Sequence, residues 1–206
     1  MLANYDMPVM AIPDFIGGFV YGLTGDNNLS EIEDCYQGGA VMEQEIVTGI
    51  NDIKHGGTDY DIQAGLEFAL AATQIPVALN TCKGMGDDLQ AIEEWASIFK
   101  DPAKLARKLA THYALHKAEI TTDIGNLEND WDAGQYFNAG KDLADIATLA
   151  IGPIQSDSYG DTDCGEFTLS TTEIADFLAG FVYGFTGENY QTYFESCFKD
   201  TPAFET

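Results

Sequence analysis

Apolar residues recur at every third or fourth position along most of the chain, which is the spacing of amphipathic helices. No stretch alternates between apolar and polar residues as a half-buried strand would. Turn residues divide the pattern into helices, which we expect at residues 8–24, 29–54, 59–74, 76–83, 87–99, 102–129, 131–150, 171–186 and 189–199. The predicted fold is therefore all-α, a multi-helix bundle with repeated helix hairpins and no significant β-sheet.

The most regular apolar stripe runs through the segment 102–129 and ends just beyond it. Its spacing is about 3.7 residues per turn, an 11-residue repeat that predicts a long straight helix and not a left-handed coiled coil. We expect this helix to be the central element of the domain. The stripe consists of Leu105, Leu109, Tyr113, His116, Ile120, Ile124, Leu127 and Trp131.

Two segments at opposite ends of the chain have nearly the same sequence. Residues 14–25 read DFIGGFVYGLTG, and residues 176–187 read DFLAGFVYGFTG. When the alignment is extended without gaps to Cys35 and Cys197, 12 of 22 positions are identical, whereas chance would supply about one or two. The chain therefore contains an internal repeat, and each copy ends in a cysteine.

Each copy predicts a helix hairpin with one tightly packed face. The pairs Gly18/Gly22 and Gly180/Gly184 are each four residues apart, which places each pair on one side of a helix. Glycine inside a soluble helix costs roughly 0.5 to 1 kcal/mol relative to alanine, so we expect these glycines to permit the close approach of another helix. A glycine C-cap then ends the first helix, and a second helix carries the cysteine.

Two further segments share the opening of the repeat. Residues 61–82 start with Asp and end with Cys82 at the same spacing, which predicts a third, degenerate copy. The sequence DWDAG at residues 130–134 opens in the same way but has Ile151 where the cysteine would fall, so it is a weaker candidate.

A long irregular segment precedes the second copy and predicts a division of the chain. We expect a helical body at residues 1–151, an acidic linker at 152–169 and a C-terminal helix hairpin at 170–206 that repeats residues 8–38.

The charge of the chain excludes two classes of partner. With 34 Asp and Glu against 9 Lys and Arg, the formal net charge is −25, and the resulting field repels nucleic acid and anionic lipid. No apolar run reaches the ~18 residues that span a bilayer, so we expect no membrane insertion.

Five basic residues gather in one segment, which is either an ordinary solvated helix face or a surface for an acidic neighbour. They are Lys100, Lys104, Arg107, Lys108 and Lys117.

The cysteines indicate an oxidising compartment. Their number is even and no C-x-x-C pair is present, which argues against a zinc site and permits two disulfides. We favour Cys35–Cys82 and Cys164–Cys197, because each pair lies within one local helical unit, over the rival Cys35–Cys197 pairing. Asn28 begins a glycosylation sequon, Asn28-Leu29-Ser30. We expect a secreted or extracellular protein, with the lumen of a secretory granule as the alternative and the cytosol not excluded.

Candidate metal sites are few. His112, His116 and Glu119 have the spacing of a helical metal site, but His116 belongs to the apolar stripe and the H-E-x-x-H pattern is absent, so we expect packed or hydrogen-bonded histidines. The predicted linker groups four acids that would suit Ca²⁺, the only cofactor we consider, although a solvated acidic linker is the preferred interpretation. These acids are Asp157, Asp161, Asp163 and Glu166.

No motif of nucleophilic catalysis or phosphate binding is present, so we expect a protein without enzymatic activity.

Three features of the sequence resemble a large group of uncharacterised helical proteins of single-celled eukaryotes, especially ciliates. These features are F-x-x-G-F-V-Y-G, the cysteine 21 positions after the aspartate, and DWDAGQYFNAGKDLADI. The resemblance spans most of residues 10–151. It implies an all-helical, cysteine-paired secreted or luminal protein and transfers no functional residue.

The repeat itself predicts a function. If the C-terminal hairpin packs on a neighbouring subunit where the first copy packs within its own, the contact is head-to-tail and propagates into a filament or lattice. The protein would then be a structural subunit whose partner is itself. The alternative is a monomeric carrier, in which the two copies pack together around a small apolar ligand lined by their aromatic residues. The residues expected to carry assembly are Phe177, Gly180, Phe181, Tyr183 and Gly184.

Overall fold

The computed structural model describes residues 11–154, and within this range every regular element is a helix. The all-α prediction is therefore confirmed for this part of the chain, whereas the predicted linker and the second copy lie outside it. The elements are α1 (Ala11–Thr24), α2 (Leu29–Cys35), α3 (Ala40–His55), α4 (Thr58–Ala78), the 3-10 turn η1 (Lys83–Met85), α5 (Gly86–Ala96), the 3-10 turn η2 (Ser97–Lys100), α6 (Pro102–Asp132) and α7 (Tyr136–Ile151).

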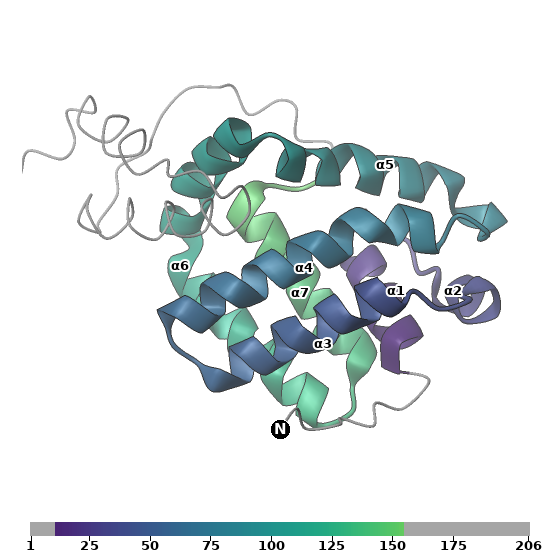
Figure 1. The fold of residues 1–206 in the computed structure, drawn as a ribbon, viewed down its shortest axis with the longest axis horizontal. Coiled ribbons are helices and arrows are strands. Elements are labelled where there is room, and N and C mark those ends of the chain that lie inside the picture. Colours follow the sequence, from purple (N-terminus) through teal and green to yellow (C-terminus); the bar gives the residue numbers. More distant parts are fainter. Residues whose placement is uncertain (1–10, 155–206) are drawn as a thin grey trace, which may run out of the picture.

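Two groups of helices enclose the core. In one, α7 packs against both α1 and α6, and in the other α3 and α4 form a hairpin that α5 adjoins along α4. Figure 1 shows α3 and α4 side by side in front of α6 and α7. The apolar side chains between the groups are almost fully buried, for example Phe15, Ile46, Phe68 and Leu127.

The first copy of the repeat consists of two helices joined by a short turn. Helix α1 ends in a turn in which the amide of Gly25 donates to the carbonyl of Tyr21 at 2.8 Å, and α2 follows with Cys35 at its end. The prediction of a single helix at 29–54 is wrong, because the chain turns between Cys35 and Ala40. Gly38 has a φ of +94° there, a conformation that glycine adopts without strain.

The break predicted at Pro76 is also wrong. Helix α4 continues through Pro76 to Ala78, and the amide of Leu79 still donates to the carbonyl of Ile75 at 2.9 Å. A proline this close to the end of a helix removes one hydrogen bond without preventing the last turn. Residues 61–82 therefore contain one helix and not a hairpin, so the structure does not bear out a third copy of the repeat.

The long helix expected from the apolar stripe is present as α6. It extends to Asp132, beyond the predicted end at 129, and Gly134 then turns the chain with a φ of +73° before α7 begins. The DWDAG segment is thus the end of a helix and not the start of a repeat copy. Along α6 the described stripe residues are mostly buried: Leu105, Leu109, Ile120, Leu127 and Trp131.

Candidate functional site

The closest helix contact in the described residues joins α1 to α7. A Cβ atom added to Gly18 would lie 2.7 Å from the carbonyl carbon of Phe137, and one added to Gly140 would lie 2.8 Å from the carbonyl carbon of Phe15. Both distances are shorter than real Cβ contacts, so the two backbones touch directly at these glycines.

The contact continues one turn further along both helices. A Cβ on Gly22 would lie 2.5 Å from the Cβ of Ala144 and 3.2 Å from the carbonyl oxygen of Lys141. Residue numbers rise together on the two helices, so α1 and α7 run in the same direction. This confirms that Gly18 and Gly22 permit a close helix approach. Gly140 was not singled out from the sequence, although a glycine inside a helical segment is the same kind of signal.

Aromatic rings close the ends of this contact. Phe15 meets Trp131 edge to face at 5.5 Å between ring centroids, and Tyr21 meets Phe137 at 5.7 Å. The edge-to-face pair adds to the stabilisation that burial alone gives, whereas the planes of Tyr21 and Phe137 are tilted by 36°. The α1 helix is therefore held by backbone contact in its middle and by rings at its flanks.

An apolar cavity of about 230 Å³ lies between α4, α6 and α7. The two lining side chains that carry polar hydrogens already have partners. The indole of Trp95 donates to the carbonyl of Gly152 at 2.9 Å, and the hydroxyl of Thr121 donates to the backbone carbonyl of Lys117 at 2.9 Å. A ligand there would meet apolar walls, which include Phe19, Phe68, Phe99, Leu109, Ile124 and Leu143.

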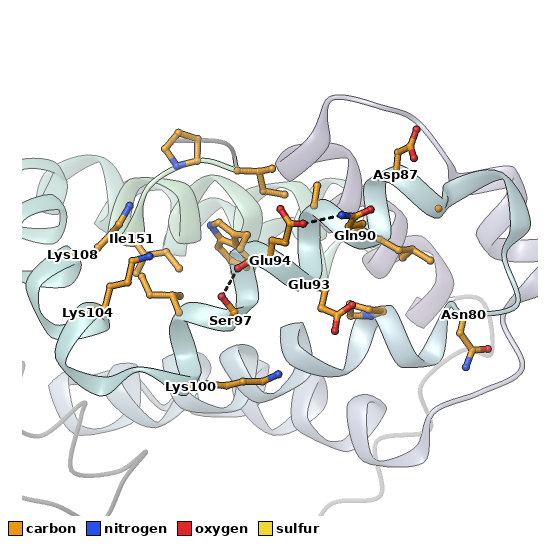
Figure 2. Close-up of a pocket in the computed structure, with 18 residues that line it drawn as sticks. Asn80, Asp87, Gln90, Glu93, Glu94, Ser97, Lys100, Lys104, Lys108 and Ile151 are labelled. Carbon is orange, nitrogen blue, oxygen red and sulfur yellow. Dashed lines mark hydrogen bonds between the residues drawn. The ribbon is translucent and has the colours of Figure 1, made fainter. Parts of the chain in front are cut away.

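A larger, more polar groove of about 1180 Å³ follows α5, η2 and the start of α6. Lys100, Lys104 and Lys108 line one part of it, and Glu93 and Glu94 line another. In Figure 2 Lys104 and Lys108 lie near Ile151, where α7 ends, while Glu94 accepts a hydrogen bond from Gln90. The basic segment noted in the sequence thus places three of its lysines in one groove.

Two carboxyl groups of the α3–α4 hairpin lie against each other. Burial, a hydrogen bond with Glu45, and the negative charges of Glu45 and Asp52 together raise the pKa of Glu67 to about 7.

A third carboxyl group, that of Asp142, lies on α7. Burial and the charge of Asp130 raise the pKa of Asp142 to about 6, and its Oδ2 atom is buried without a hydrogen-bond partner. Glu67 and Asp142 therefore hold protons more firmly than ordinary carboxylic acids.

The structure places several of the other candidate residues. Cys35 and Cys82 form a disulfide with their Cα atoms 5.4 Å apart, the pairing favoured from the sequence. The side-chain amide of Asn28, the predicted glycosylation site, donates to Asp88 at 2.7 Å. His116 makes a 2.8 Å contact with Glu119 through Nδ1.

No group of three or more His, Cys, Asp or Glu within residues 11–154 is arranged to hold a metal ion. No helix in the same range is long and apolar enough to cross a membrane. The remaining candidates lie outside the described residues: the cysteines Cys164 and Cys197, the acids Asp157, Asp161, Asp163 and Glu166, and the assembly residues Phe177, Gly180, Phe181, Tyr183 and Gly184.

Comparison with known proteins identifies a family for most of the chain. A family model described as SctB-like, secreted protein B-like, matches residues 5–151. This segment contains the first copy of the repeat and the whole of α7, and the second copy lies beyond it. No curated protein and no solved structure matches the chain.

Proposed function

Since the chain belongs to the SctB-like family, we propose that it is a secreted, non-enzymatic subunit that assembles with copies of itself. In this proposal the second copy of the repeat, residues 176–187, packs on α7 of a neighbouring subunit in the position that α1 occupies within its own. The observation that supports it is the glycine contact between α1 and α7, because the second copy carries the same glycines.

The second copy keeps both glycines that face α7. Gly18 and Gly22 correspond to Gly180 and Gly184 in the gapless alignment. Each of the two α1 glycines leaves no room for a Cβ against α7, since the nearest atoms are backbone atoms or the Cβ of Ala144. Any helix that replaces α1 at this site therefore needs glycine at both positions.

The third glycine of α1 is the one that changes. Gly17 corresponds to Ala179, and a Cβ at Gly17 would meet only Leu29, with its Cδ1 atom 2.8 Å away. The end of a leucine side chain can rotate away at little cost, whereas backbone cannot move without displacing a helix. The difference between the copies thus falls where the α7 contact does not constrain the sequence.

The apolar face is also retained in the second copy. Within the aligned segment, which begins at Asp14, the five α1 residues that are buried in the core remain apolar, and two of them become larger or differently branched. Phe15, Ile16, Phe19, Val20 and Leu23 correspond to Phe177, Leu178, Phe181, Val182 and Phe185. Outside that segment the buried Ala11 corresponds to Glu173 at the same offset.

Such an exchange is head-to-tail, because the donor surface and the acceptor surface differ. Contacts of this kind close into rings or continue as filaments. The net charge of −25 opposes the approach of two subunits, so assembly should strengthen as salt screens the repulsion.

Light scattering at physiological ionic strength, over a range of protein concentrations, tests the proposal. We expect the mass of the native protein to rise above 22.4 kDa with concentration, and Gly180→Leu to hold it at 22.4 kDa. Glu188→Leu is the matched control, because it adds the same side chain at the position of exposed Asp26 and should leave assembly unchanged. A native mass fixed at 22.4 kDa, or assembly of Gly180→Leu equal to that of the native protein, would refute it.

The apolar cavity favours a second candidate function, the binding of a small apolar ligand. Its walls have no unpaired polar group among the described lining residues, and dry cavities of this order bind molecules such as benzene. Titration with indole, followed by calorimetry, should show saturable binding. Ala72→Phe should abolish it by filling the cavity, whereas Ala118→Phe on the exposed face of α6 should not. Equal binding by both variants would argue against the cavity as the site.

A further inference from the structure

Two lysines of the polar groove form a short row on α6. Lys104 and Lys108 lie one helical turn apart, about 6 Å along the axis at 1.5 Å per residue. Lys100 also lines the groove but belongs to η2, and the extended residue Asp101 separates it from α6. Within the described residues no ion pair joins the side chains of these lysines to an acid, whereas Lys54, His116 and Lys141 each pair with one.

This concentration of positive charge is unusual for the chain. Three of its nine basic residues line one groove, although acids outnumber bases by 34 to 9. Lysine ammonium groups attract carboxylates, and the low dielectric of a partly enclosed groove strengthens the attraction relative to an open surface. The groove is therefore suited to an acidic segment of polypeptide.

The structure shows where such a segment enters the groove. Helix α7 ends at Ile151, and the next carbonyl, that of Gly152, accepts the indole hydrogen bond of Trp95 at 2.9 Å. Pro153 and Ile154 then line the groove together with the lysines. The chain is thus directed into the groove by a fixed hydrogen bond just before its acidic segment begins.

We propose that the acidic segment of residues 155–166 binds along the lysine row of the same chain. A chain spans at most about 3.3 Å per residue, so Asp157 is within about 10 Å of Ile154, which itself lines the groove together with Lys104 and Lys108. The connection is therefore long enough for the acids of this segment to reach both lysines.

The rest of the groove directs the segment to the lysines. Asp87, Glu93 and Glu94 line the side formed by α5 and repel carboxylates, whereas the α6 side offers only ammonium groups among its charged lining residues. The inference does not depend on the proposed assembly, because it concerns a contact within one subunit.

Carbodiimide cross-linking of the full-length protein tests this contact. The reagent joins a lysine to a carboxylate only when the two are in contact, and an equal mixture of ¹⁴N and ¹⁵N chains shows by mass spectrometry whether the two residues belong to one chain. We expect links from Lys104 and Lys108 to the acids of residues 157–166 within one chain, at least fivefold more abundant than links from the exposed lysines Lys83 and Lys117. Links between chains, or equal yields from all four lysines, would overturn the inference.

Protease access provides a second measurement that does not depend on cross-linking chemistry. Cleavage before aspartate within residues 155–166 should accelerate severalfold in Lys104→Glu/Lys108→Glu, because the segment is released from the groove. Lys117→Glu carries the same kind of charge reversal on an exposed part of α6 and should leave the rate unchanged. The helical circular dichroism signal of each variant reports whether the body stays folded. An unchanged rate in a folded double variant would refute the binding.

Discussion

Adding one methyl group at Gly18 should separate α1 from α7. The new Cβ would lie 2.7 Å from the carbonyl carbon of Phe137 and 3.0 Å from the amide nitrogen of Lys141, so the obstacle is backbone and no side chain can rotate to relieve it. A retreat of about 1 Å would restore normal contact, and a gap of that size forfeits a quarter to a half of the dispersion attraction across the interface. Overpacking of this kind typically costs about 1 to 3 kcal/mol, and we expect Gly18→Ala to lie near the upper end.

Gly125→Ala is the matched control for this substitution. Gly125 lies inside α6, and a Cβ there would meet nothing within 4 Å, so the same change should stabilise the protein by about 0.5 to 1 kcal/mol through helix propensity alone. Urea unfolding followed by circular dichroism gives both values, and a loss near 3 kcal/mol lowers the midpoint by about 1 M or more. If Gly18→Ala is as stable as Gly125→Ala, the close contact between α1 and α7 does not exist.

Three further results are expected from the same unfolding measurement. The double variant Gly18→Ala/Gly140→Ala should lose less stability than the sum of the two single losses, because one separation of the helices relieves both clashes; a fully additive loss would contradict this. Reducing the Cys35–Cys82 disulfide, which closes a loop of 47 residues, should cost about 4 kcal/mol, and a loss below about 1 kcal/mol would contradict the loop-entropy argument. The folded-state pKa of Glu67, about 7, exceeds its usual value of 4.5, so its contribution is complete below pH 4.5 and declines as the pH rises through 7. Stability should therefore fall between pH 5 and 8, and Glu67→Gln should reduce that fall; an equal pH dependence in the variant would refute this role.

Much of the secondary structure follows from local patterns in the sequence. The apolar stripe of α6 identifies a long buried helix because burial on one side requires a helical period, and the glycine pair of α1 identifies a tight face because glycine is otherwise unfavourable in helices. The errors fall at the boundaries of helices. Pro76 remains helical since it lies in the last turn of α4, and the chain turns at Gly38 although the residues on both sides are helical.

The candidate sites depend on which helices become neighbours, and local patterns do not contain that information. The apolar cavity is bounded by side chains from six helices, and no single segment of the sequence marks it. The sequence indicates only part of the contact made by the α1 glycine pair. Gly140 can be recognised in the sequence as a glycine inside a helix, but its contact with the backbone of Phe15 cannot. The groove differs in that its lysines form a visible basic cluster, whereas its position at the end of α7 became clear only in three dimensions.

The Cys35–Cys82 disulfide also determines how easily α1 can be replaced. It fastens the end of α2 covalently next to the end of α4, so that α1, joined to α2 through the short turn after Thr24, stays beside α7 even when it detaches. A segment held by so short a connection has an effective local concentration of the order of millimolar. In the proposed assembly, the second copy on another molecule would compete with that concentration, so exchange would require either very high protein concentration or a loosened α1. The bridge would then act as a threshold that keeps dilute protein monomeric and confines assembly to places where the protein accumulates.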